Sequence, residues 1–133
     1  MIYDAVVVGG GPAGATAALR LAQAGWTVAL IEKSSFPRRK VCGEFISATS
    51  MPLLRNLGMD QDFYAQAGPE FHRVGIFAGD YTIIAPMPVP PRGTHLWGRA
   101  LGREHLDTLL LKRVATAGVT VWQPWTEIGR AHV

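Results

Sequence analysis

The chain has 133 residues, 48% of them hydrophobic, with 13 Lys and Arg against 10 Asp and Glu, four His and one cysteine. This length fits one domain, and a net charge of +3 spread along the chain is not the pattern of a nucleic-acid-binding protein. One cysteine excludes an intrachain disulfide, the histidines lack metal-ligand spacing, and the apolar runs are too short to span a bilayer. We expect a cytoplasmic globular protein without a metal, a nucleic-acid partner or a transmembrane segment.

Residues 2–31 predict a strand, a helix and a second strand. The β-branched apolar run over 2–8 is typical of a strand buried on both faces of a parallel sheet. Pro12 follows a glycine cluster and suits the first turn of a helix, which we expect over 12–24. Residues 26–31 predict the second strand. This order indicates a Rossmann-like α/β domain with a parallel sheet.

The remaining elements form a less regular series. Residues 34–40 are a loop, rich in Ser, Pro and basic residues. After it, the sequence predicts a helix over 47–57, a hairpin of 73–78 and 81–85, a proline-rich connector over 86–91, a helix over 103–117 and a strand over 119–122. Core packing is the expected role of the aromatic residues Trp97, Trp122 and Trp125. For Phe77 and Tyr81 it is favoured over the alternative of lining a pocket.

The last residues, 127–133, resemble the translation of a sequencing adapter. We therefore expect a non-native tail after residue 126, and residues 1–126 to be the N-terminal part of a longer protein. A natural polar C-terminus is the alternative interpretation.

The glycine cluster carries the pattern Gly9-x-Gly11-x-x-Gly14 between the first strand and the helix, which is the context that a dinucleotide fingerprint requires. Gly9 permits the tight turn, Gly11 lets the backbone approach a pyrophosphate, and Gly14 permits close helix–sheet packing. The N-terminus of the helix offers N–H groups and a positive dipole end to the phosphates. The alternative is a glycine-rich turn without a ligand.

Glu32 ends the second strand, where a carboxylate can accept hydrogen bonds from the adenosine ribose. A carboxylate there disfavours a 2′-phosphate because the charges would repel. The spacing does not separate NAD from FAD, and a solvated acid at a strand end is the alternative interpretation.

Several residues outside the fingerprint are also candidates. Arg38, Arg39 and Lys40 form a compact basic loop suited to phosphate or adenine contacts, with a solvated loop as the alternative. Arg103 stands at the N-terminal end of its predicted helix, where the helix dipole disfavours a cation, and this indicates a ligand-facing role. Cys42 has no identifiable partner base, so we do not expect a covalent nucleophile.

Four segments together resemble the N-terminus of FAD-dependent oxidoreductases: residues 3–14, Ile31-Glu32-Lys33, residues 36–44 and the helix start from Arg103 to Leu110. The similarity is to the geranylgeranyl reductases and the para-hydroxybenzoate-hydroxylase-like monooxygenases, with the flavin-dependent halogenases related, and it extends over residues 2–126. It implies that residues 70–100 belong to a β-rich, substrate-facing insertion in the FAD-binding domain.

The resemblance also implies a cofactor site. In such enzymes the Cys-Gly pair lies near the isoalloxazine, and an arginine at the position of Arg103 helps to hold the flavin. Together with the fingerprint and the basic loop, the expected FAD-binding residues are Gly9, Gly11, Pro12, Ala13, Gly14, Glu32, Lys33, Arg39, Lys40, Cys42, Gly43 and Arg103. Catalytic residues cannot be named from this sequence.

The expected function is therefore that of an FAD-dependent oxidoreductase that reduces a double bond or hydroxylates with oxygen. The resemblance implies a small-molecule substrate, isoprenoid or aromatic, and NAD(P)H or a partner protein as electron donor. The alternatives are a halogenase and a non-catalytic dinucleotide-binding module, and residues 1–126 alone are expected to be inactive. An NAD-dependent dehydrogenase is disfavoured because no regular strand–helix–strand continuation follows Glu32.

Overall fold

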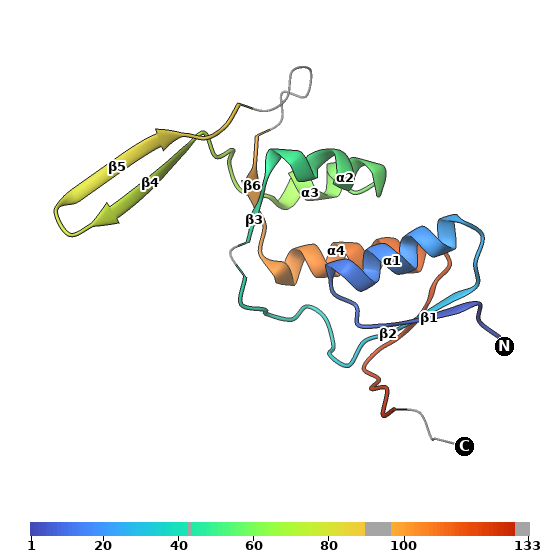
Figure 1. Cartoon of the computed structure of the whole chain (residues 1–133). Helices are drawn as coiled ribbons and strands as arrows, with labels where there is room; N and C mark the ends of the chain where they lie inside the picture. Colours follow the sequence, from blue (N-terminus) through green and yellow to red (C-terminus); the bar gives the residue numbers. More distant parts are fainter. Residues whose placement is uncertain (43, 90–96, 130–133) are drawn as a thin grey trace. The chain divides into compact units, whose positions relative to one another are not determined.

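The computed structural model describes residues 1–42, 44–89 and 97–129 (Figure 1). The chain divides into two compact units. The first comprises Met1–Cys42 and Gly102–Val133, and the second comprises Gly43–Leu101. The range 70–100, expected to be a β-rich insertion, falls within the second unit.

The first unit contains a parallel sheet of three strands in the order β1-β2-β7. These are β1 (Ala5–Val8), β2 (Val28–Ile31) and β7 (Thr120–Trp122), and the register pairs Val8 with Ile31 and Ile31 with Trp122. Two helices, α1 (Pro12–Gln23) and α4 (Arg103–Thr116), lie side by side and pack against the strands (Figure 1). The expected Rossmann-like α/β domain is confirmed in this unit.

Apolar residues of both helices and of the central strand make the core of the first unit. Ala15, Ala18 and Leu19 of α1 are inaccessible to solvent, and so are Ala29 and Leu30 of β2. In β1, by contrast, Val6 and Val8 are 52% and 61% exposed. The prediction that the first strand is buried on both faces is therefore wrong for the described residues, because the helices cover only one side of it.

The strand–helix–strand continuation after Glu32, which the sequence did not reveal, is present in the structure. The chain leaves β2, forms the second unit, and returns through α4 to β7, which pairs in parallel with β2. The second crossover of the Rossmann-like unit is therefore complete, but its helix begins only at Arg103. Because the second unit lies between β2 and α4 in the sequence, the strand–helix–strand order is not regular in spacing.

The second unit contains short helices and two small antiparallel sheets. Its elements are β3 (Phe45–Ile46), a 3-10 turn (Ala48–Ser50), α2 (Met51–Asn56), α3 (Asp60–Gln66), β4 (Arg73–Ala78), β5 (Tyr81–Pro86) and β6 (Arg99–Ala100). The helix expected over 47–57 is divided into the 3-10 turn and α2, with Pro52 in the first turn of α2. Helix α3 was not predicted, and its Phe63 packs in the core with Met51 and Met59.

The hairpin of β4 and β5 has the predicted position and turn. Its register pairs Ala78 with Tyr81, and Gly79 in the turn has a positive φ of 57°. Every residue of both strands is exposed in the described structure, including Phe77 at 73% and Tyr81 at 81%. The expectation that these two aromatic residues pack in a core is therefore wrong for this unit.

Candidate cofactor-binding site

The turn between β1 and α1 has the close backbone approach that its glycines predict. Gly9 has a φ of 103°, a conformation that favours glycine, and its N–H donates to the carbonyl of Ile31 at 2.7 Å. A Cβ on Gly14 would collide with the carbonyl oxygen of Gly9 and would lie 3.4 Å from Val7 Cγ1. Helix α1 can approach the turn and β1 only because residue 14 has no side chain.

Gly11 differs from Gly14 because the space beside it is open. A Cβ on Gly11 would meet only guanidinium nitrogens, at 3.7 Å from Arg103 and 3.8 Å from Arg38, which are ordinary contact distances. Gly11 is the N-cap of α1, and no side chain caps the helix. The first N–H groups of an α-helix have no partner within the helix, so this end is suited to an anion.

Glu32 lies directly beside this turn and is only 4% exposed. Its Oε2 accepts the N–H of Gly10 at 2.7 Å, and its Oε1 accepts the N–H of Ser34 at 2.8 Å. A Cβ on Gly10 would lie 3.2 Å from the Glu32 Cβ. The fingerprint treats position 10 as variable, but here the Glu32 side chain packs against it and would have to shift slightly to accept a Cβ.

The environment of Glu32 favours its ionised form. Burial raises the pKa of the carboxyl, but hydrogen bonds from the Ser34 and Gly10 backbone and the charge of Arg38 lower it by more. The net result is a pKa below its ordinary value of 4.5. Glu32 is therefore a buried carboxylate at neutral pH. Its negative charge is stabilised by the N–H groups of Gly10 and Ser34 and by Arg38.

A second buried carboxylate, Asp107 of α4, completes a cluster of four charged side chains. Arg103 donates to Asp107 through Nε at 2.8 Å and through Nη2 at 3.0 Å. Arg38 Nη2 lies 3.5 Å from Asp107 Oδ2 and 3.6 Å from Glu32 Oε2. The bidentate contact with Asp107 raises the pKa of Arg103, and the Cys42 side chain contributes in the same direction. The cluster links the end of β2 to the first turn of α4.

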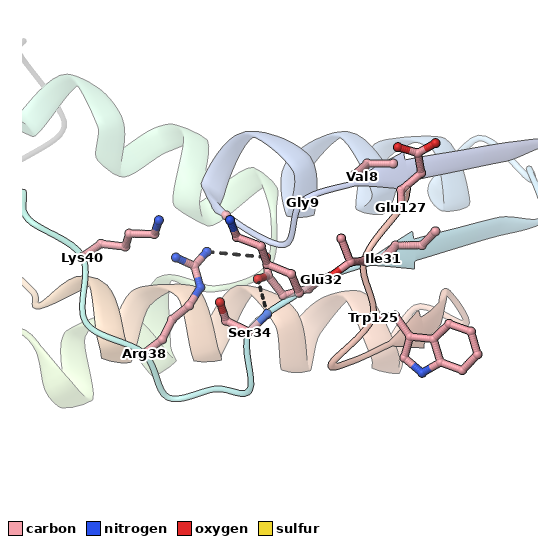
Figure 2. A pocket seen from close by; sticks show the side chains of 12 residues that line it. Val8, Gly9, Ile31, Glu32, Ser34, Arg38, Lys40, Trp125 and Glu127 are labelled. Carbon is pink, nitrogen blue, oxygen red and sulfur yellow. Dashed lines mark hydrogen bonds and ion pairs between the residues drawn. The ribbon is translucent and has the colours of Figure 1, made fainter. Parts of the chain in front are cut away.

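A cavity of about 410 Å³ opens between the β1–α1 turn and the end of β2 (Figure 2). In this view Arg38 and Ser34 point toward Glu32, whereas the ring of Trp125 points away from them. The predicted site residues in its wall are Gly9, Gly11, Glu32, Lys33 and Lys40, joined by Val8, Ile31, Ser34, Arg38, Trp125, Thr126 and Glu127. A cavity of this size is within the range of small-molecule and cofactor sites.

The other predicted residues lie near the cavity or on the surface. Pro12 and Ala13 form the first turn of α1. The Arg39 side chain is 93% exposed and pairs with Glu104 at 3.2 Å, outside the cavity wall. Cys42 is exposed and interacts with Arg103, while Gly43 lies outside the described residues.

Three residues of the site were not among those predicted. Arg38 was considered only as part of the basic loop, Asp107 only as part of a helix pattern, and Trp125 was expected to pack in a core. Trp125 is 61% exposed and lines the cavity. Asp107 had a detectable signal, since it shares one helical face with the buried residues Leu110, Leu111 and Val114.

The described part of the chain offers no group of His, Cys, Asp or Glu that could hold a metal ion. Within the same residues, none of the helices has the length and hydropathy needed to cross a membrane.

Comparison with known proteins identifies the kind of cofactor. Residues 2–126 match the family model described as FAD binding domain. The chain belongs to this family. The match supports FAD, rather than NAD, as the dinucleotide for which this fold and its glycine turn are built.

Curated relatives of this FAD-binding domain include enzymes of different activity. The chain is 33% identical to a menaquinone reductase of Mycobacterium tuberculosis over 115 residues, which are 86% of this chain and 27% of that protein. It is 32% identical to a flavin-dependent halogenase of Armillaria mellea over 130 residues, covering 90% of this chain and 24% of the other. The chain thus spans about a quarter of the length of these relatives.

Solved structures similar to this chain also include an oxygenase and a reductase-like protein. A 2-methyl-3-hydroxypyridine-5-carboxylic acid oxygenase matches with a TM-score of 0.70 and 30% identity, over 89% of this chain and 30% of that one. A geranylgeranyl bacteriochlorophyll reductase-like protein of Thermoplasma acidophilum matches with a TM-score of 0.70 and 30% identity, over 90% and 29% of the two chains. The predicted resemblance to FAD-dependent reductases and monooxygenases is confirmed.

Proposed function

We propose that the cavity of the first unit binds the ADP portion of FAD. The observation that carries this proposal is the open Cα of Gly11 at the N-terminus of α1, next to a buried, ionised Glu32 in the same cavity. The diphosphate lies over Gly11, and Glu32 accepts hydrogen bonds from the adenosine ribose. Ionised carboxylate oxygens have more acceptor sites than the two backbone N–H groups use, so Glu32 retains this capacity.

The charges around the cavity support an anionic ligand. The Nε and Nη1 atoms of Arg38 are buried without a hydrogen-bond partner among the described residues. Lys33 and Lys40 line the same cavity. Unpaired buried donors and nearby cations are both stabilised by phosphate oxygens. Pro12, Ala13 and Gly14 contribute the helix start, and Arg103 approaches Gly11 from α4.

The assignment for the remaining predicted residues rests on the resemblance. Cys42 and Gly43 are proposed to lie near the isoalloxazine, and the interaction between Cys42 and Arg103 is consistent with this placement. Arg39 is the weakest candidate, because it is exposed and already paired with Glu104.

For the whole protein we propose an FAD-dependent oxidoreductase, either a reductase or a monooxygenase, acting on an isoprenoid or aromatic small molecule. When bound, FAD supplies the redox chemistry, while the residues of this chain bind and orient it. The activities named for the relatives, menaquinone reductase and pyridine-carboxylic acid oxygenase, support these two classes. A halogenase is the second candidate, supported by the Armillaria mellea relative.

NAD(P)H is the proposed electron donor. Anaerobic mixing of the FAD-loaded protein with NADH or NADPH should bleach the oxidised-flavin absorbance. A flavin that stays oxidised with both nucleotides would contradict this donor and would indicate a partner protein in its place.

The cofactor assignment is tested by titrating the FAD-free protein with FAD and comparing Glu32→Gln with Glu44→Gln. Loss of a charge-assisted hydrogen bond should weaken binding by about tenfold or more in Glu32→Gln. Glu44, an exposed carboxylate of the second unit, is the matched control and should leave FAD affinity unchanged. Equal affinity for wild type and Glu32→Gln would remove the ribose assignment.

A further inference from the structure

We infer that Asp107 is the positioning residue that holds the guanidinium groups of Arg38 and Arg103 beside Gly11, where they bind the diphosphate of FAD. This inference rests on the proposed FAD site and adds a residue that does not itself line the cavity but contacts Arg38, which does.

Asp107 is fully buried, with 0% exposure, on a helical face that is otherwise apolar. A buried carboxylate is tolerated when its charge is paired and its oxygens accept hydrogen bonds. Arg103 satisfies both oxygens in a bidentate contact, and Arg38 Nη2 approaches Oδ2 at 3.5 Å. One carboxylate therefore holds two guanidinium groups from different segments of the first unit.

The two guanidinium groups converge on one point. A Cβ on Gly11 would lie 3.7 Å from Arg103 Nη2 and 3.8 Å from Arg38 Nη2. Two cations that approach the same glycine repel each other unless an anion lies beside both. Asp107 is that anion, and it keeps both groups at the position where the glycine fingerprint places the diphosphate.

Arg38 is also fixed from its other sides. Its Nη2 faces Glu32 at 3.6 Å, and its guanidinium carbon lies 4.7 Å from the centre of the Phe36 ring. Its side chain is 13% exposed. Arg38 is therefore held before any ligand arrives, and a preorganised cation loses little conformational freedom on binding.

Whether Asp107→Asn strengthens or weakens diphosphate binding distinguishes a positioning role of Asp107 from a purely electrostatic one. Asp107 is negative, so its neutralisation makes the site more positive, and this alone would tighten binding of a diphosphate. If Asp107 acts by positioning, Asp107→Asn must do the opposite. The amide nitrogen of Asn cannot accept a hydrogen bond, so one of the two oxygen contacts to the guanidinium groups is lost and at least one guanidinium shifts from Gly11.

The experiment measures the affinity of the FAD-free protein for FAD, ADP and adenosine by calorimetry. In Asp107→Asn we expect FAD and ADP to bind about tenfold or more weaker, and adenosine to bind as in wild type. Adenosine lacks the diphosphate, so a loss of structure would weaken adenosine and ADP alike. Tighter or unchanged ADP binding, or equal losses for ADP and adenosine, would overturn the inference.

Two further variants keep the test decisive. Glu104→Gln removes a partly exposed carboxylate from the same helical turn and should leave all three affinities unchanged. If Asp107→Asn does not fold, the double variant Arg103→Gln/Asp107→Asn removes the buried pair together and is compared with Arg103→Gln. ADP should bind the double variant no tighter than Arg103→Gln, and tighter binding would show that the carboxylate only repels the ligand.

The outcomes also separate this inference from the proposed function. A wild-type protein that binds neither FAD nor ADP overturns both. A wild-type protein that binds both ligands, with Asp107→Asn behaving identically, overturns only the role of Asp107.

Discussion

The β1–α1 turn and the β4–β5 hairpin are both built around glycine, but their surroundings differ. In the first, the backbone is closely enclosed, since Gly14 abuts the Gly9 carbonyl and Glu32 packs against Gly10. In the hairpin, Gly79 has no atom within 4 Å of a Cβ position, and both strands are exposed. The β1–α1 turn combines an enclosed Gly14 with open space beside Gly11, where a ligand can approach the backbone, whereas Gly79 only permits the conformation of its turn.

The charged residues show the same contrast. Glu32 and Asp107 are buried and form a linked cluster with Arg38 and Arg103. The Arg39–Glu104 pair lies on the surface, although each member directly follows a cluster arginine in the sequence. Exposed ion pairs contribute little to the stability of the fold, whereas a buried carboxylate is tolerated only when its charge is paired. Within the basic loop, Arg38 belongs to this buried cluster, whereas Arg39 does not.

Among the substitutions that test this comparison, the positive control Phe63→Ala apart, the largest effect is expected from Gly14→Ala. Its Cβ would collide with backbone rather than with a flexible side chain, so α1 must move away from the turn, and we expect a loss of about 3 kcal/mol in the free energy of unfolding. Gly25→Ala is the control, because Gly25 has a φ of 88° but open space, and should cost about 1 kcal/mol. Chemical denaturation measures the free energy of unfolding of both variants. Equal losses would contradict the claim that the backbone around Gly14 is closely enclosed.

An intermediate, pH-dependent effect is expected from Glu32→Gln. At neutral pH we expect the free energy of unfolding to fall by about 1–3 kcal/mol. The uncharged Gln is a weaker hydrogen-bond partner than the carboxylate for the two backbone N–H groups and for Arg38. The pKa of Glu32 is lowered in the folded state, so its contribution is complete above the ordinary value of 4.5 and is lost as the pH falls through the lowered pKa. Unfolding curves of the two proteins should converge below pH 4.5. A constant difference down to the acid limit would contradict the lowered pKa.

The smallest effect is expected in the hairpin. Phe77→Ser should change the free energy of unfolding by no more than about 0.5 kcal/mol, because the ring is exposed. Phe63→Ala in the same unit is the positive control and should cost about 3–5 kcal/mol, since Phe63 is fully buried. A large loss for Phe77→Ser would show that the hairpin packs against a surface outside the described residues.

Local elements were predictable because their signals are short-range. Hydrophobic periodicity and glycine placement located α1, α4 and the hairpin to within a residue or so, as the observed bounds show. The pairing of β7 with β2 was not predictable from pattern, because the second unit separates them in sequence. Helix α3 has Asp60 and Asp62 in its first turn but only seven residues, too few for a periodic pattern, and the burial of Phe63 holds it in the core.

The candidate site divides in the same way. Gly9, Gly11, Gly14 and Glu32 follow from a fingerprint with fixed spacing, and the structure brings them together. The Arg38–Asp107 contact joins residues far apart in the chain, so only the tertiary structure reveals it. The placement of Arg39 on the surface likewise depends on which way the loop faces, which adjacent basic residues do not specify.

Gly11→Ala is the sharpest test of the proposed FAD site. The residue has φ −73° and ψ −179°, which alanine adopts without strain, and the new Cβ meets only ordinary contacts at 3.7 and 3.8 Å. The variant should fold with unchanged stability, yet its methyl group occupies the space proposed for the diphosphate. We predict that calorimetric titration shows FAD and ADP binding weakened by about tenfold or more, with adenosine unaffected. Wild-type affinity for FAD in a folded Gly11→Ala protein would contradict the placement of the diphosphate over this turn.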